Sequence, residues 1–290
     1  MSPDAASLFS RVLGFIALFQ ASGAAIFLLL FGRTLAKSAT TIRSLGMVAA
    51  IGGILLLLVH QLIEAARMAD DWSGVFEADL QAIAWTSSNA AFHEGAVVGL
   101  TLVAVGLARR LPPSTRIALL GSIIAVCAFL LTGHSSVHRL RWFLAPLLGA
   151  HLLIVAFWFG ALLPLYLLCQ KESLAIAADV VRRFSAIAIW LVPTLAAAGL
   201  LMAIVLSSAD VAVLTRPYGQ LLSVKLAAFG LLMSFAAYNK WRLTPALSDG
   251  KSAALRGLRR AIAAEYLIIV AVLAVTAILT MYYSPEGNAT

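Results

Sequence analysis

The chain has 290 residues, of which 62% are hydrophobic and 12% are charged. Soluble domains carry roughly 25% charged residues, so this composition excludes an ordinary soluble protein and predicts an integral membrane protein. The net charge of +8 does not indicate nucleic-acid binding, because the basic residues lie in short connections between apolar runs, where they set membrane topology.

The first apolar run covers about residues 8–31. It is longer than the hydrophobic region of a signal peptide and lacks a basic segment before it, so we expect a retained membrane span. Crossing a bilayer takes roughly 20 mostly apolar residues. Eight runs qualify, and the sequence therefore predicts an all-α polytopic membrane protein, a single transmembrane domain (1–290) built as a bundle of eight helices: 8–31, 44–66, 83–108, 116–133, 146–169, 184–207, 217–239 and 260–283.

Basic residues concentrate in alternate connections between these runs. The four basic connections cover about residues 33–43, 109–116, 171–183 and 240–260. Because short cytoplasmic connections are enriched in Lys and Arg, these should face the cytoplasm. Both chain termini would then face outward, which in a bacterium is the periplasm. Residues 70–89 mix charges with aromatic side chains, and we expect an interfacial amphipathic segment leading into the third span.

All five histidines fall on the predicted outer side. His134 and His138 end the fourth run and His151 opens the fifth, while His60 and His93 lie in the outer parts of the second and third. A polar residue in hydrocarbon usually faces the bundle interior, and neutral imidazole binds copper, zinc, iron or nickel. We therefore predict that His60, His134 and His151 converge on a metal site. His93 and His138 are further candidates, with ordinary packing or interfacial roles as the alternative.

Side chains near these histidines extend the candidate site. Glu64 follows His60 by four residues and shares its helix face. Three methionines lie near the outer ends of the second, sixth and eighth spans, where their thioethers would favour Cu(I), with gap-filling in the core as the alternative: Met68, Met202 and Met281.

Two charged residues are predicted at similar depth in different spans. Lys225 lies about eight residues into the seventh span, and Glu94 lies in the third. An isolated ammonium in hydrocarbon is costly, so we hypothesise that the two pair, the alternative being that Lys225 reaches outward to the interface. Glu265 and Tyr266 in the eighth span either line an exit route or serve capping and packing.

The second half of the chain, roughly residues 130–285, resembles the copper resistance protein D (CopD) family of bacterial inner-membrane proteins. The third span departs from the family pattern, because it reads AFHEGAVVGL, with Glu94 and no arginine. The resemblance rests on five motifs in order: Gly133-His134, His151 followed by Trp158-x-Gly160, Arg183-Phe184-Ser185, Tyr218-Gly219-x-Leu221-Leu222-x-x-Lys225 and Tyr238-Asn239-Lys240-Trp241-Arg242.

The resemblance implies eight transmembrane helices and a role in moving copper across the inner membrane, usually beside a small periplasmic copper-binding protein of the CopC type. It also implies that His134 and His151 are the first ligands to consider, with Trp158 and Lys225 in support.

The leading hypothesis is a copper transporter that takes up Cu(I) or Cu(II) from the periplasm. The sequence contains no GxxxxGK[ST] loop, so ATP-driven pumping is not expected. One alternative is a haem-binding or quinone-linked electron-transfer protein, because histidines near one end of several spans also ligate haem. Another is a membrane sensor or assembly subunit that binds copper without conducting it. No catalytic arrangement is legible, and we expect the protein not to be an enzyme.

Overall fold

The computed structural model describes residues 1–108, 114–207 and 215–283. The described residues form helices and no strand, and eight helical segments are long and apolar enough to cross a membrane. The predicted all-α polytopic fold is confirmed. The spans are α1 (Pro3–Phe31), α2 (Ala39–Ala69), α4 (Ser88–Ala108), α5 (Ser114–Cys127) continued by η2 (Ala128–Leu131), α7 (Arg141–Lys171), α8 (Leu174–Leu206), α9 (Pro217–Tyr238) continued by η4 (Asn239–Leu243) and α10 (Thr244–Ser248), and α11 (Ser252–Tyr282).

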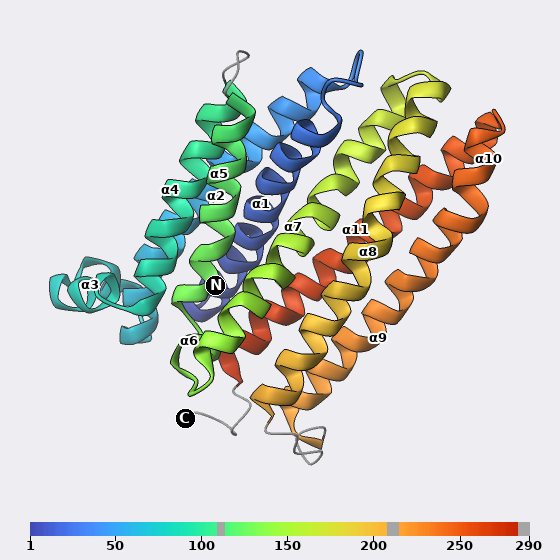
Figure 1. Cartoon of the computed structure of the whole chain (residues 1–290). Helices are drawn as coiled ribbons and strands as arrows, with labels where there is room; N and C mark the ends of the chain where they lie inside the picture. Colours follow the sequence, from blue (N-terminus) through green and yellow to red (C-terminus); the bar gives the residue numbers. More distant parts are fainter. Residues whose placement is uncertain (109–113, 208–214, 284–290) are drawn as a thin grey trace.

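The long helices run side by side in one bundle (Figure 1). The helices α2, α4 and α5 pack around one side of α1, and α8 and α9 lie on the opposite side of the molecule. Between these groups α1 packs on α7 and α11, so the first and second halves of the chain meet along these three helices.

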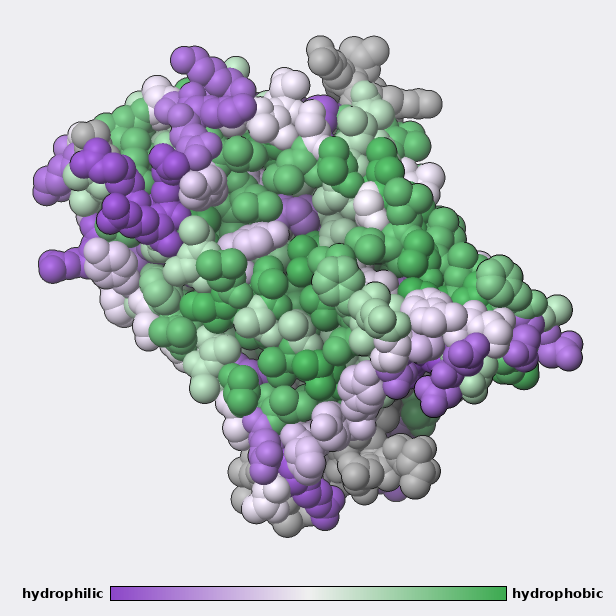
Figure 2. Space-filling model, turned by 180° about the vertical axis from the view of Figure 1, so that it is seen from behind, coloured by the Kyte–Doolittle hydropathy of each residue, from purple (hydrophilic) through white to green (hydrophobic). Residues whose placement is uncertain are grey.

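The surface of the bundle carries a broad band of hydrophobic side chains, with hydrophilic side chains gathered toward its ends (Figure 2). Large apolar residues are exposed on α2, α8 and α9, among them Leu55, Leu200 and Leu226. An apolar surface of this extent is typical of a lipid-facing surface, because hydrocarbon is as apolar as these side chains.

The two ends of the bundle differ in charge, as predicted. One end, here called the basic end, carries the connections after α1, α7 and α10 and the last turn of α4, and it lies at the top of Figure 1. The opposite end, here called the N-terminal end, is where α1 begins and α11 finishes. All five histidine positions belong to the half of the bundle at the N-terminal end.

The segment after α2 leaves the bundle. Asp70 adopts a left-handed conformation with φ 52° and ends α2. The chain then forms η1 (Trp72–Phe76) and α3 (Ala78–Trp85), which project from the side of the bundle in Figure 1. The third span therefore begins at Ser88 and not at residue 83, because this short helix is a separate element.

Helices α1 and α7 cross at two glycines. A Cβ atom added to Gly23 would lie 2.3 Å from both the Ala156 carbonyl oxygen and the Gly160 Cα. Beside this crossing, Gln20 Nε2 donates a 3.0 Å hydrogen bond to the Gly160 carbonyl. Close backbone approach at small residues is a common way for helices to associate in membranes, where burial of apolar surface provides no drive. The glycine pair therefore sets the distance between the two halves of the bundle.

A buried carboxylate ties the halves together at the basic end. Glu172, which follows α7, accepts hydrogen bonds at Oε1 from the Lys37 N–H at 2.8 Å, the Ser38 N–H at 2.7 Å and the Ser38 hydroxyl at 2.6 Å. Burial raises the pKa of Glu172, but the hydrogen bonds from Ser38 and Lys37 outweigh it, and the pKa lies below its ordinary value of 4.5. The ionised carboxylate is therefore the form that stabilises the fold.

This hydrogen bonding predicts a pH-dependent contribution to stability. At pH 7 the Glu172→Gln protein should be less stable than wild type by about 1–3 kcal/mol, since a charged acceptor is lost from buried donors. A lowered carboxyl pKa stabilises above the unfolded-state value, and the contribution disappears as the pH falls through the folded-state value. Thermal unfolding in detergent should thus show a difference at pH 7 that vanishes well below pH 4.5. The matched control is Glu77→Gln, at an exposed glutamate, and an equal loss there would contradict the assignment.

Candidate metal site

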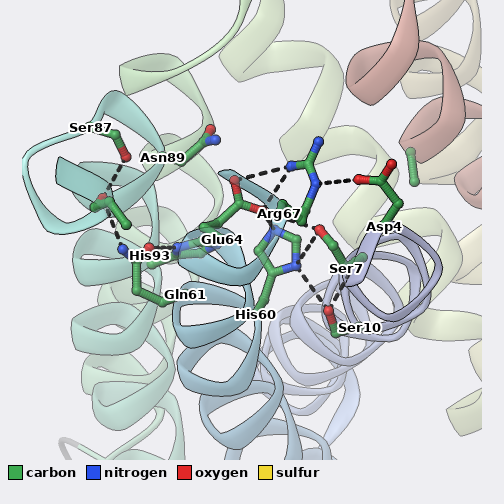
Figure 3. A network of polar contacts seen from close by, with 12 residues as sticks. Asp4, Ser7, Ser10, His60, Gln61, Glu64, Arg67, Ser87, Asn89 and His93 are labelled. Carbon is green, nitrogen blue, oxygen red and sulfur yellow. Dashed lines mark hydrogen bonds and ion pairs between the residues drawn. The ribbon is translucent and has the colours of Figure 1, made fainter. Parts of the chain in front are cut away.

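Two histidines meet inside the first half of the bundle. His60 on α2 and His93 on α4 are buried, and their rings lie edge to face with centroids 5.1 Å apart (Figure 3). His60 lies on the face of α2 that also buries Leu57, Gln61 and Glu64, at the spacing of one helix face. The α4 helix buries His93 together with Ala96 in the same way. The helix packing that forms the core therefore also brings the two imidazoles together.

The hydrogen bond of His93 fixes which tautomer its neutral ring adopts. Gln61 Nε2 donates to the Ala84 carbonyl at 3.0 Å, which turns Gln61 Oε1 toward His93 Nδ1 at 2.5 Å. An amide oxygen only accepts, so Nδ1 carries the hydrogen, and in the neutral ring Nε2 then presents a lone pair. Histidines that bind metals usually donate their other ring N–H to a carbonyl or carboxylate in this manner. Gln61 therefore orients the His93 ring and leaves its Nε2 without a hydrogen in the neutral form.

His60 is held in the same form. Ser10 Oγ donates to the Ser7 carbonyl at 2.9 Å and lies 2.9 Å from His60 Nδ1. With the single Ser10 proton directed to the Ser7 carbonyl, Ser10 Oγ accepts from His60 Nδ1 and His60 Nε2 carries a lone pair, an assignment made from these partners. That lone pair faces Glu64 Oε1 at 3.4 Å. Two acceptors at this distance repel, and a cation between them removes the repulsion.

Charged side chains close the cluster toward the N-terminal end. Arg67 Nη1 lies 3.0 and 3.1 Å from the two Glu64 oxygens, and its Nε donates to Asp4 at 2.9 Å (Figure 3). Ser7 also donates to Glu64 at 3.1 Å. Glu64 is thus already neutralised by Arg67. Across the described residues, no group of three or more His, Cys, Asp or Glu side chains is arranged to hold a metal ion. The cluster accordingly offers two imidazoles, with Glu64 available only if Arg67 releases it.

The cluster includes residues that the sequence analysis missed, namely Ser7, Ser10, Gln61 and Arg67. The spacing of these residues in the sequence did indicate that they share the inward faces of α1 and α2. Ser7 and Ser10 are three residues apart on α1, and His60, Glu64 and Arg67 continue one face of α2 at spacings of four and three. Polar residues repeated along one face of an apolar helix mark the side that turns inward.

The predicted convergence of His60 with His151 is wrong. His151 lies on α7, and its Nδ1 donates to the Leu195 carbonyl of α8 at 3.2 Å. A Cβ on Gly199 would lie 3.2 Å from the His151 ring, so the imidazole packs against α8, on the side of the bundle away from α2. The partner of His60 is His93, which the sequence analysis placed among the further candidates. Lys225 of α9 lies close enough to His151 to act on it electrostatically.

His134 and His138 do not end the fourth membrane helix as predicted. The helix stops at Leu131, and Gly133 with φ 81° begins a separate short helix, α6 (His134–Val137). His138 is half-buried and extended, and its Nδ1 accepts from the Leu140 N–H at 3.0 Å. The two histidines therefore do not share a face of the span. The side chain of His134 lies outside the described residues.

The hypothesised pair of Glu94 and Lys225 does not form. Glu94 is exposed on α4, whereas Lys225 is half-buried on α9, and these helices lie on opposite sides of the bundle in Figure 1. Similar depth was the basis for the hypothesis, and depth does not specify which helices are neighbours.

The remaining predicted residues are dispersed. Trp158 is buried on α7 and interacts with the carboxyl of Glu265. Met68 is exposed near the end of α2, and Met281 is half-buried near the end of α11. Met202 is half-buried and follows Leu195 and Gly199 on the face of α8 that carries the contacts of His151.

Comparison with known families matches both halves of the chain. Residues 1–139 match the family described as copper resistance protein D-like, N-terminal domain, and residues 178–279 match copper resistance protein D. Neither the comparison with curated proteins nor the comparison with solved structures gave a match. The two family matches cover most of the chain and include α2, α4 and α9, which carry His60, His93 and Lys225. The chain is a multi-pass membrane protein and belongs to the copper resistance protein D family.

Proposed function

We propose that the protein imports copper from the periplasm across the bacterial inner membrane, and that His60 and His93 form the site at which the ion enters the bundle. The observation that supports this most is the pair of buried imidazoles, each held by a hydrogen bond at Nδ1 so that Nε2 is free to bind. Family membership supplies the identity of the ion, and imidazole nitrogen is a good copper ligand. We propose transport without a catalytic step.

The electrostatics of the cluster favour an ion that binds and leaves. Asp4 and Glu64 face the cations Arg67 and Arg11, so the fixed charges balance and no net negative charge retains a divalent ion. The cluster is therefore better suited to monovalent Cu(I) than to a divalent copper ion. Two ligands of a tetrahedral ion bound at about 2.1 Å lie about 3.4 Å apart. His60 Nε2 and Glu64 Oε1 already have that separation, so the carboxylate joins the ion once Arg67 moves.

The second half of the bundle offers a subsequent position. His151 has the same tautomer as the entry pair, because its Nδ1 donates to the Leu195 carbonyl. Met202 lies on the adjoining face of α8, and Lys225 is near enough to oppose a resident cation. We propose that the ion passes this position without being stored there.

The orientation follows from the basic end, which we place in the cytoplasm by the distribution of Lys and Arg. The N-terminal end then faces the periplasm and presents acidic residues after α2, including Asp71 and Glu77, beside the entry cluster. A small CopC-like copper-binding protein is the proposed donor at this surface.

Flux through sealed liposomes distinguishes transport from binding. Purified protein is reconstituted into vesicles loaded with an impermeant Cu(I) chelator, and Cu(I) is added outside under reducing conditions. We expect the chelator to be titrated at a rate proportional to the protein content, with Mg²⁺ giving no flux. Binding of copper without flux would support a sensor or assembly role, and a strong Soret band in the purified protein would support the haem-binding alternative.

A further inference from the structure

A carboxyl group lies buried in the second half of the bundle, apart from the entry cluster. Glu265 is 3% exposed and lies 13 residues after Ser252, the start of α11, which is about 20 Å along the helix from the basic end. Ionisable residues at such depth are costly and mark functional positions in membrane proteins. None of the motifs or candidate metal ligands includes it.

The partners of Glu265 are neutral. Asn239 Nδ2 donates to Oε1 at 2.5 Å, and the Trp158 indole also interacts with the carboxyl. Of the two basic residues that precede Glu265 most closely on α11, Arg260 is exposed, and Arg259 donates to the Tyr166 hydroxyl at 3.2 Å and lies over that ring. Within the described ranges, no salt bridge reaches Glu265. An ionised carboxylate without a cation in this position would be strongly disfavoured.

Asn239 lacks a donor that a protonated carboxyl would supply. Its Oδ1 is buried and has no hydrogen-bond partner in the described structure. A protonated carboxyl pairs with an amide through two hydrogen bonds, one from the amide N–H and one from the acid O–H. The first of these is present between Asn239 and Glu265, and the missing second bond requires a proton on Glu265. Asn239 also begins η4, a π-helical segment, and such segments occur frequently at functional sites.

Other titratable groups around this position have separate partners or separate places. On α11 they are Tyr266, which stacks on Phe159, Arg259, which bonds to Tyr166, and Arg260, which is exposed. On α7 the group is Tyr166, and beside Asn239 they are Tyr238, which is exposed, and Lys240, which is half-buried. Gln20 of α1 is polar but not titratable, and it bonds to Gly160. Among these groups, Glu265 is therefore the buried acid without a charged partner, and only a bound proton can neutralise it.

We propose that Glu265 and Asn239 form a proton-binding site that couples copper movement to proton movement. The inference rests on the proposed transport function. A proton and a monovalent copper ion are alternatives at one carboxylate, since each neutralises one negative charge. As an incoming Cu(I) approaches, the O–H bond of the carboxyl breaks, the proton leaves toward the periplasm and the ion takes over the charge. After the ion leaves toward the cytoplasm, the carboxylate takes up a proton from that side, so one proton leaves the cytoplasm for each copper ion that enters.

The test uses Glu265→Gln, whose amide oxygen still accepts from Asn239 Nδ2 and whose amide N–H can donate to Asn239 Oδ1, but which never ionises. Vesicles carrying a trapped pH dye should become alkaline inside during copper uptake by wild type, and this pH change should be lost in the variant. Copper binding at the entry site formed by His60 and His93, which Glu265 does not contact, should remain as in wild type. The control is Glu94→Gln, at an exposed glutamate, which should keep the pH change. Copper uptake by Glu265→Gln with an unchanged pH response would overturn the proposal.

A second readout separates this inference from transport itself. The infrared spectrum of the wild-type protein at neutral pH should contain the band of a protonated carboxyl. This band should be absent from the spectrum of Glu265→Gln and shifted in that of Glu265→Asp. If wild type carries no copper yet shows this band, the transport function fails and the proton site stands. If the band is the same in wild type and Glu265→Gln, the proton site fails whatever the flux. The spectra also remain informative if the Gln variant folds poorly, because the Asp variant retains a carboxyl.

Discussion

Copper uptake by the His93→Ala protein is expected to fall to the level of vesicles without protein, and the His60→Ala protein should behave alike. Each change removes one of two imidazoles, and a single neutral imidazole with a carboxylate already paired to Arg67 is a weak copper site. Gln61→Ala leaves both ligands but removes the acceptor that orients His93, and should lower copper affinity by about 10- to 100-fold. The measurement is chelator competition with purified protein, followed by vesicle flux.

The matched control for these variants is His138→Ala. This half-buried histidine belongs to the same end of the bundle but lies in the connection before α7, and its loss should leave uptake unchanged. Folding is checked by gel filtration of each variant, because the loss of His93 also leaves Gln61 Oε1 without its donor. Folded His93→Ala and His60→Ala proteins with wild-type copper affinity would contradict the assignment.

Enlarging Gly160 should prevent the two halves of the bundle from packing. A Cβ at this position would lie 2.4 Å from the Gly23 Cα and 2.6 Å from the Phe19 carbonyl oxygen. Because both are backbone atoms, no side chain can rotate aside and the helices must separate. We expect Gly160→Ala and Gly23→Ala to destabilise by about 3 kcal/mol or more, and Gly160→Leu to yield little folded protein.

Glycines elsewhere provide the comparison for this prediction. A Cβ on Gly52 of α2 or on Gly230 of α9 would meet nothing within 4 Å. Alanine at these sites should be neutral or stabilise by up to about 1 kcal/mol, since alanine has the higher helix propensity. Thermal unfolding in one detergent compares all four alanine variants. Equal stability of Gly160→Ala and Gly52→Ala would show that the crossing of α1 and α7 is looser than described.

The eight spans were predictable because each is a long apolar run, and hydropathy alone locates such runs. The residues at which the spans begin and end were less predictable. Residues 83–85 are apolar enough to join the third span, yet α3 ends at Trp85 and α4 begins at Ser88. Likewise the positive φ at Gly133 separates His134 from the fourth span, and nothing in the hydrophobic pattern signals that break.

The site was only partly predictable, for a physical reason. The relation between His60 and Glu64 follows from a spacing of four on one helix, and the structure has it at 3.4 Å. The partnership of His60 with His93, in place of His151, depends on which helices are neighbours. Hydrophobic periodicity identifies an inward face but not the helix that it meets. For the same reason the predicted pairing of Glu94 with Lys225 was wrong, because these residues lie on α4 and α9, which are not neighbours.

Copper K-edge X-ray absorption on purified protein carrying one copper per chain tests the entry site most directly. We expect two imidazole nitrogens bound to copper in wild type and one fewer in both His60→Ala and His93→Ala, with the His151→Ala spectrum equal to wild type. A sulfur-dominated spectrum, or an imidazole signal that survives in both variants and disappears in His151→Ala, would contradict it.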